Sequence, residues 1–142
     1  MVSKDKISRK LIQLDEYLGF LKEISNKSES GFLNDKILIG SAKYYLQVSI
    51  ECCLDIANHI IASERLRAPK DYADSFSILG ENDNLEASLV TKLRQMAKFR
   101  NRLVHLYGDI DDSFVYDFIK NDITDIKAFQ KDIVNQFIRS DV

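Results

Sequence analysis

Residues 32–65, FLNDKILIGSAKYYLQVSIECCLDIANHIIASER, carry the helical spacing from which the fold can be inferred. Small and apolar side chains recur three or four residues apart in this stretch, which places them along one face of a helix. They are Ile39, Ala42, Leu46, Ser49, Cys53, Ile56 and Ile60. We therefore predict a long helix from Phe32 to Arg65. Pro69 prevents its continuation, because proline lacks an amide proton and disfavours helix in the residue before it.

Apolar side chains at helical spacing continue on both sides of this segment. A first helix is predicted over Lys4–Ile24, with one apolar stripe made by Ile7, Leu11, Leu14, Leu18 and Leu21. The polar stretch SNKSESG, Ser25–Gly31, is predicted to be a loop. A short helix is expected over Tyr72–Leu79, and Gly80 stands where a glycine commonly ends a helix.

Two further helices complete the predicted architecture. One runs from Asn84 to Leu106, and the last begins at Asp112 or Ser113, either of which can cap it, and ends near Arg139. The buried side of the last helix is supplied by Phe114, Phe118, Ile126, Phe129, Ile133 and Phe137. Long helices joined by short connections pack antiparallel. The predicted fold is all-α, an antiparallel bundle of about five helices in a single domain over residues 1–142.

Composition narrows the possible functions. The chain has 142 residues, 45% of them hydrophobic and 30% charged, with one proline and five glycines, too few turn residues for an all-β fold. The net charge is −2 and the pI is about 5.7. A protein that holds nucleic acid over a broad surface is usually basic overall. Any binding of RNA must therefore depend on a local basic patch.

Several features indicate the reducing interior of a cell. Cys52 and Cys53 are neighbours in a predicted helix, so their side chains point about 100° apart and cannot form a disulfide with each other. We expect two buried free thiols. The first residues, MVSKDKISRKL, lack the apolar run of a signal peptide, and no window has the apolar length of a membrane span. The prediction is a cytoplasmic protein that does not enter a membrane.

The helix predicted over Asn84–Leu106 has a charged residue within its apolar stripe. The stripe passes through Leu89, Leu93, Met96, Leu103 and Tyr107. At about 100° per residue, position 100 falls inside this stripe, and it is occupied by Arg100. A guanidinium on an inward face is costly unless it is paired or lines a cavity or an interface. Glu51 is the acid that we expect to orient it.

Arg100 is followed by His105, and these two residue types suit the transesterification of RNA. Histidine can transfer protons at neutral pH, and arginine holds phosphate oxygens with two parallel donors. No metal is needed when the nucleophile is the 2′-hydroxyl of the substrate. Asn101 lies four residues before His105 and shares its face, so its amide is expected to orient the imidazole. On an unbroken helix Arg100 and His105 diverge by about 140°. They can meet at one phosphate only if the helix loosens near its end or if a second subunit supplies one of them, and we expect the second.

Plainer interpretations exist for these residues. Cations near the end of a helix are favourable with its dipole whatever the function. Arg94, Lys98 and Arg102 recur every four residues and form either a solvated face or a contact for an RNA backbone.

Other candidate residues give weaker signals. His59 is flanked by apolar residues and is expected at the edge of the core, with a hydrogen-bond partner. Glu51 and Asp55 could share a metal only with further ligands, and we predict no metal and no other cofactor. Asp109, Asp111 and Asp112 are interpreted as a turn and helix cap that could also help a partner to dock. The sequence has no phosphate-binding loop, dinucleotide fingerprint or zinc spacing.

The stretch RNRLVHLY, residues 100–107, resembles the R-x4-H-x-Y signature of the HepT family, which are toxins of the HEPN superfamily. Three upstream blocks resemble that family in order and spacing: LQVSIE at 46–51, DIANHIIA at 55–62 and LRAPKDY at 66–72. The resemblance covers residues 4–138. It implies a homodimeric bundle whose two motifs face each other across a composite cleft, with metal-independent endoribonuclease activity on tRNA or mRNA.

The resemblance also implies roles for individual residues. Arg100 and His105 would be catalytic, and Asn101 would support them. Tyr107 matches the tyrosine that an MNT-type nucleotidyltransferase antitoxin modifies with AMP. An alternative is a non-catalytic partner of such a nucleotidyltransferase that binds nucleotide or protein. A third possibility is a purely structural bundle in which Glu51 neutralises Arg100.

Overall fold

The computed structural model describes residues 1–105 and 109–139, and within these ranges the regular structure is entirely helical. The helices are α1 (Lys4–Ser25), α2 (Glu29–Leu33), α3 (Lys36–Ser63), α4 (Tyr72–Glu81), α5 (Ala87–His105), α6 (Asp112–Asn121), α7 (Ile123–Ile133) and the π-helical turn η2 (Val134–Ile138). The predicted all-α fold is confirmed. In the part of the chain that is described, no helix is long and apolar enough to cross a membrane.

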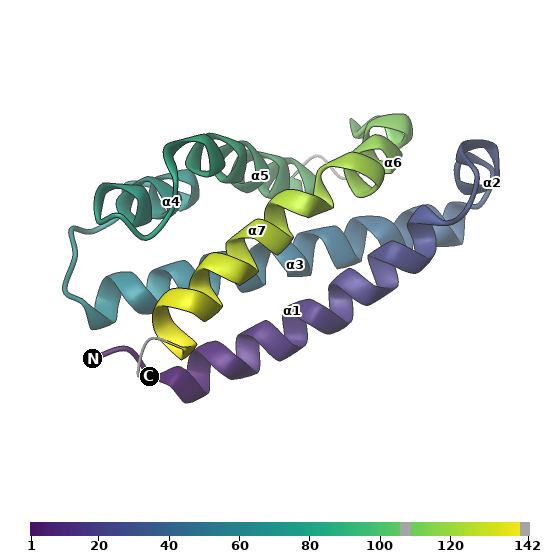
Figure 1. Cartoon of the computed structure of the whole chain (residues 1–142). Helices are drawn as coiled ribbons and strands as arrows, with labels where there is room; N and C mark the ends of the chain where they lie inside the picture. The colour runs from purple at the N-terminus through teal and green to yellow at the C-terminus, as the bar shows by residue number, and fades with distance from the viewer. Residues whose placement is uncertain (106–108, 140–142) are drawn as a thin grey trace.

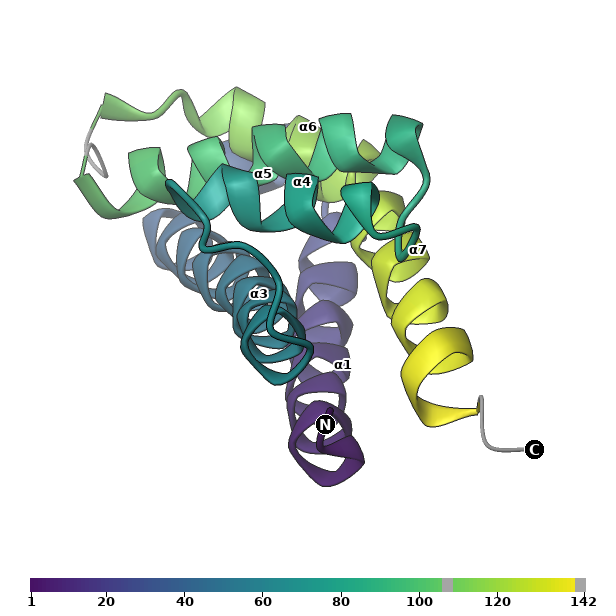
Figure 2. The same ribbon diagram turned by 90° about the vertical axis from the view of Figure 1, so that its left-hand side faces the viewer.

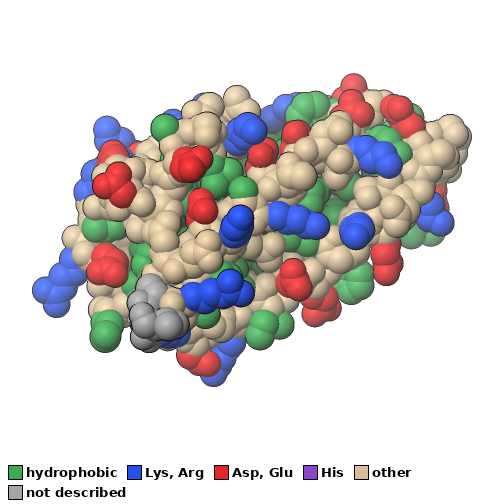
Figure 3. All heavy atoms as spheres, viewed as in Figure 1, with side chains coloured by type: hydrophobic (Ala, Val, Ile, Leu, Met, Phe, Trp, Pro, Cys, Tyr) green, Lys and Arg blue, Asp and Glu red, His purple; other side chains and the backbone are tan. Residues whose placement is uncertain are grey.

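The long helices α1 and α3 lie side by side and run in opposite directions (Figure 1). The α4–α5 pair lies across them, and α7 returns beside α1 so that it closes the bundle (Figure 2). Helix α3 contacts α1, α4 and α5, and it is therefore the central element. Acidic and basic side chains are interspersed over the face that carries α1 and α7, and basic ones form a broken row across its middle (Figure 3).

The core sits between these helices. Phe32, Phe76 and Phe129 are fully buried, and the rings of Phe76 and Phe129 meet edge to face with centroids 5.8 Å apart. This contact joins α4 to α7. Cys52 and Cys53 are buried free thiols, as predicted, and burial raises the pKa of Cys52 to about 11. A thiol with such a raised pKa stays protonated and is a poor nucleophile.

The predicted helix over Phe32–Arg65 is divided near its start, and the predicted loop over Ser25–Gly31 is partly helical. Ser28 caps α2 by accepting a hydrogen bond from the Gly31 amide at 3.1 Å. Asp35 then caps α3 by accepting one from the Leu38 amide at 3.0 Å. Both are side chains that prefer to satisfy the free amides at a helix start, and this preference outweighs the apolar continuity.

The last predicted helix is also divided. Asp122 ends α6 and begins α7, with its amide bonded to the Phe118 carbonyl at 2.8 Å. The cap of α6 is Asp111, which accepts from the Ser113 amide at 2.9 Å, rather than Asp112 or Ser113. Asp112 instead forms an ion pair with Lys43 of α3 at 3.1 Å. The bend allows α6 to cover α2 while α7 turns back along α1.

Gly80 does not end a helix, because α4 continues to Glu81 with Asn82 as its C-cap. A Cβ atom at Gly80 would lie 2.7 Å from Cγ2 of Val90 on α5, so the glycine is needed for close approach of the two helices. The left-handed backbone conformation falls on Asp83, with φ of 61°. Helix α5 begins at Ala87, three residues later than predicted, because Asn84 belongs to the turn and its amide bonds the Leu79 carbonyl at 2.8 Å.

Candidate active site

Arg100 and Glu51 meet at the contact between α5 and α3. Glu51 Oε2 accepts hydrogen bonds from Arg100 Nε at 2.9 Å and from Nη2 at 2.6 Å. The Arg100 side chain is 17% exposed and that of Glu51 is 30% exposed. The same Glu51 oxygen accepts from Gln47 Nε2 at 3.3 Å. The guanidinium is thus fixed along one edge, in a partly dry site where an ion pair is stronger than at the surface.

Two more side chains surround the guanidinium. Asn101 Oδ1 accepts from Arg100 Nη1 at 3.2 Å. The ring of Tyr72, the first residue of α4, lies under the guanidinium with its centroid 5.1 Å from Cζ, a cation–π distance. Arg100 therefore contacts a carboxylate, an amide and an aromatic face. Such a set positions a charge well while leaving the Nη1 side bonded only to a neutral group.

Asn101 lies one turn before His105 on α5, but its amide oxygen is directed to Arg100. Among the described residues the Asn101 carbonyl oxygen bonds to Arg100, and no hydrogen bond joins Asn101 to His105. His105 is the last residue of α5 and is exposed. Since α5 is a regular α-helix from Arg100 to His105, the two side chains diverge by about 140° and one chain does not bring them together.

Except for Asn101, sequence reasoning missed the residues that line the surface next to Arg100. A depression of about 380 Å³ is lined by Asn58, Pro69, Asp71, Tyr72, Ser75 and Asn101. Ser75 Oγ donates to Asn58 Oδ1 at 2.7 Å, which joins α4 to α3 within it. Three of these residues, Pro69, Asp71 and Tyr72, lie in the block at 66–72 that resembles the family. That block could have indicated this surface, but the resemblance assigned it no role.

A cluster of charges holds the connection between α3 and α4 in place. The Arg67 guanidinium donates to both carboxylate oxygens of Asp74 at 2.7 and 2.8 Å and to Glu81 at 2.8 and 2.9 Å. Arg67 lowers the pKa of Asp74 far below its usual range and also lowers the pKa of Glu81. Asp71 caps α4 by accepting from the Asp74 amide at 2.7 Å. These contacts fix the start of α4 and hence the position of Tyr72.

Of the three residues of the predicted basic ridge, Arg94 contacts another helix. Arg94 Nη1 donates to Ser77 Oγ of α4, which ties this arginine to the helix pair. Lys98 and Arg102 are exposed. The structure therefore leaves Lys98 and Arg102 as the members of the ridge that face solvent.

Other predicted residues fall at different places. Tyr107 lies outside the described residues. Asp109 is exposed. Asp55 pairs with Lys10 of α1 at 2.9 Å, whereas Glu51 pairs with Arg100 of α5. His59 is at the edge of the core, as predicted, and its Nε2 accepts a hydrogen bond from the Ser3 amide at 3.0 Å.

Comparisons with known proteins identify the family of the chain. The model of the family described as ribonuclease HepT-like matches residues 14–133. The chain is 33% identical over 100 residues to the mRNA nuclease HepT of Shewanella oneidensis, covering 70% of this chain and 75% of that protein. It is 30% identical over 112 residues to the tRNA nuclease HepT of Aphanizomenon flos-aquae, covering 78% and 75%.

A solved structure of a HEPN toxin has the same fold as this chain. The tri-AMPylated HEPN toxin of Shewanella oneidensis, in complex with its MNT antitoxin, superposes with a TM-score of 0.87 at 28% identity, covering 94% of this chain and 100% of that one. The family match, the sequence relatives and the structural neighbour all span most of the chain. The chain belongs to the ribonuclease HepT-like family.

Proposed function

We propose that this protein is the toxin of a toxin–antitoxin system and an endoribonuclease that cleaves tRNA or mRNA without a metal. The observation that carries this function is Arg100, a charged residue on the inward face of α5 that is held by Glu51, Asn101 and Tyr72. A guanidinium fixed in this way serves to bind a phosphate. The relatives named as mRNA and tRNA nucleases support RNA as the source of that phosphate.

In the proposed mechanism, His105 takes the proton of the ribose 2′-hydroxyl, whose oxygen then attacks the adjacent phosphorus. A bond forms between phosphorus and the 2′-oxygen, and the bond to the 5′-oxygen breaks. His105, which now carries the proton of the 2′-hydroxyl, gives it to the leaving 5′-oxygen. Arg100 stabilises the negative charge that develops on the phosphoryl oxygens, and its fixed position avoids the cost of reorganising solvent at that moment.

The active form is proposed to be a homodimer in which Arg100 of one subunit works with His105 of the other. The divergence of the two side chains on one helix supports this arrangement. Apolar side chains in the surrounding elements are exposed: Tyr44 of α3 at 54%, Tyr72 of α4 at 46% and Val104 of α5 at 39%. Burial of such groups against a second copy is a common basis for symmetric association.

The partner that restrains the toxin is proposed to be an MNT-type nucleotidyltransferase that transfers AMP to Tyr107. The solved toxin relative is AMP-modified and bound to an MNT antitoxin, which supports this partner. An AMP group adds negative charge two residues from His105, where it would compete with the phosphate of RNA. We further propose that the chain is a single cytoplasmic domain over residues 1–142.

The proposal is tested by cleavage of tRNA and mRNA in EDTA by purified protein whose Tyr107 is shown to be unmodified by intact mass. Arg100→Ala and His105→Ala are expected to lower the rate by at least about a hundredfold. Arg139→Ala removes an exposed arginine elsewhere and should leave the rate unchanged. Equal cleavage by all four proteins would assign the activity to a contaminant.

A non-catalytic binding function is the second candidate, because the Arg100 contacts are complete in one subunit while His105 stands apart. Calorimetry with nucleotides distinguishes the two. Binding of a nucleotide that is lost in Arg100→Ala, by unmodified protein that cleaves no RNA, would establish the binding module in place of the nuclease.

A further inference from the structure

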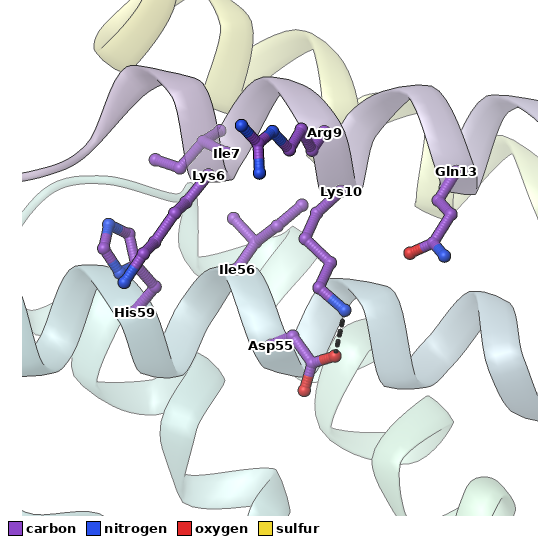
Figure 4. A pocket seen from close by; sticks show the side chains of 8 residues that line it. All are labelled: Lys6, Ile7, Arg9, Lys10, Gln13, Asp55, Ile56 and His59. Carbon is purple, nitrogen blue, oxygen red and sulfur yellow. Dashed lines mark hydrogen bonds and ion pairs between the residues drawn. The ribbon is translucent and has the colours of Figure 1, made fainter.

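A second concave site lies between α1 and α3, away from the Arg100 contacts. This α1–α3 groove has a volume of about 410 Å³, and its lining includes Lys6, Ile7, Arg9, Lys10, Ile56 and His59 (Figure 4). Lys6, Lys10 and Gln13 extend from α1 toward α3 in a row (Figure 4). On α3, His59 and Asp55 lie opposite Lys6 and Lys10. The groove is thus built by two antiparallel helices rather than by a loop.

Positive charge is concentrated on this groove although the chain has a net charge of −2. Three cationic side chains line it against the single carboxylate of Asp55. Lys10 pairs with Asp55 at 2.9 Å and Arg9 with Asp5 at 2.7 Å, and all four side chains are at least 42% exposed. Exposed ion pairs of this kind contribute little to stability, so Lys10 and Arg9 can exchange their carboxylate partners for a more highly charged anion such as a phosphate. Within the described residues Lys6 has no ion-pair partner.

The floor of the groove is apolar. Ile7 and Ile56 line the groove and are each 1% exposed. The His59 ring stands at one end, with Nε2 fixed by the Ser3 amide. Burial lowers the pKa of His59, and so do the charges of Lys6 and the N-terminal amine. The ring is therefore neutral near pH 7 and offers a flat face on which a base can stack.

The groove lies next to the candidate active site along α3. Asp55 is one helical turn beyond Glu51, and His59 is one turn further, so the groove begins about 6 Å along the helix axis from the Arg100–Glu51 pair. A strand bound at Arg100 would reach Lys10 and then Lys6 as it follows α3.

We infer that the α1–α3 groove binds one nucleotide of a single-stranded RNA substrate, with its base on Ile7, Ile56 and His59 and its phosphate at Lys6 and Arg9. This inference rests on the proposed ribonuclease function and adds a binding site for the substrate strand. A cationic rim over an apolar floor is the arrangement that holds single strands without reading their sequence.

A second basic cleft provides a control. Lys22, Lys120 and Lys127 line a cleft of about 160 Å³ between α1 and the α6–α7 segment, less than half the volume of the α1–α3 groove. Lys120 Nζ there already donates to the Ser25 carbonyl at 2.8 Å. Removing charges at Lys22 and Lys127 changes the net charge as much as removing those of Lys6 and Arg9.

The first experiment measures binding of a fluorescent oligoribonucleotide in EDTA to His105→Ala protein, which prevents cleavage. Lys6→Gln with Arg9→Gln is expected to weaken binding roughly tenfold and to reduce the slope of log affinity against log salt by about 0.7, as for one phosphate that is no longer neutralised. Lys22→Gln with Lys127→Gln should keep the parent affinity and slope. Equal affinity of the two double variants, or no RNA binding by the parent, would overturn the inference.

A second experiment separates this site from the chemistry. In otherwise wild-type protein, Lys6→Gln with Arg9→Gln should raise KM about tenfold and leave kcat unchanged. If the wild-type protein cleaves no RNA, the proposed function is wrong, but the binding experiment still shows whether the groove binds an RNA strand. Free 5′-AMP is the competitor: displacement of the oligoribonucleotide only at far higher concentration supports a strand site. If AMP displaces the oligoribonucleotide at concentrations near the Kd of the RNA, the groove is a site for a free nucleotide and the inference is overturned.

Discussion

The Glu51 carboxylate is the contact that allows Arg100 to keep its charge on the inward face of α5. Both hydrogen bonds from the guanidinium are accepted by Glu51 Oε2, so Oε1 contributes little to the position of the guanidinium. The Asn101 amide and the Tyr72 ring complete the surroundings. If the proposed function is correct, the rate of cleavage should depend on Glu51 although Glu51 need not touch RNA.

Glu51→Gln is expected to lower the free energy of unfolding by about 1–2 kcal/mol, because it leaves a partly buried guanidinium without its counter-charge. Cleavage should fall on the order of tenfold as Arg100 loses its fixed position. Urea unfolding and RNA cleavage check the two effects. Gln47→Ala, which removes only the 3.3 Å hydrogen bond to the same carboxylate, is the control and should be much milder. A fully active Glu51→Gln protein would show that Arg100 is positioned by other groups.

The lowered pKa of His59 predicts a dependence of stability on pH. As the pH falls through the usual histidine range near 6.5, the unfolded chain binds a proton that the folded chain does not, so the free energy of unfolding decreases. In His59→Gln this contribution is absent. The excess stability of the wild type over the variant should therefore be smaller at pH 5.5 than at pH 7.5, as measured by urea unfolding.

Gln13→Ala changes the same groove without changing a titrating group, and its effect should be equal at both pH values. An excess stability of the wild type over His59→Gln that grew toward low pH would mean that the folded protein favours the protonated imidazole.

At the scale of elements, the contact between α4 and α5 depends on the absence of a side chain at Gly80. Gly80→Ala should lower the free energy of unfolding by about 1–3 kcal/mol, because its Cβ would lie 2.7 Å from a methyl group of Val90. Adding Val90→Ala should recover part of this loss. Thermal or urea unfolding of the two single variants and the double variant measures the coupling.

Gly19→Ala is the matched control, because nothing lies within 4 Å of its Cβ position in the middle of α1. It should raise stability by about 0.5–1 kcal/mol through helix propensity alone. A stabilising Gly80→Ala would contradict the proposed packing role of this glycine.

The helices were predictable from sequence wherever an apolar stripe ran without interruption. The helix that becomes α1 was predicted to within one residue of its end. The two predicted helices that proved to be divided break at Asp35 and Asp122, where an aspartate interrupts a helical pattern whose apolar residues continue beyond it. One sequence does not reveal whether such a side chain caps a new helix or faces solvent, because tertiary packing decides between the two.

A residue of the candidate site could be predicted from sequence where its charge interrupts an apolar stripe. Site residues without such a signal could not. Arg100 stood out because it is charged within an apolar stripe, and Glu51 was its natural counter-charge. Tyr72 gave no such signal, because a tyrosine at a helix start is unremarkable until α4 is placed against α5. The α1–α3 groove joins residues about fifty positions apart, and no local spacing relates them.

At the scale of the whole molecule, the divergence of Arg100 and His105 makes the proposed dimer testable. Equal amounts of Arg100→Ala and His105→Ala proteins, each inactive alone, should regain about a quarter of wild-type cleavage after subunit exchange, since half of the dimers are mixed and one of their two sites is intact. Cleavage before and after exchange through mild denaturation is the measurement. No recovery would show that one subunit supplies both residues.

The ion pairs that Glu51 and Asp55 of α3 form also have a consequence for how the gene can change in length. Glu51 faces α5 and Asp55 faces α1, one turn apart on a single rigid rod. One inserted codon between them would rotate everything beyond it by about 100° and separate the two pairs from each other. Inherited insertions and deletions should therefore be purged from this stretch and should accumulate in the connections at residues 26–28 and 82–86.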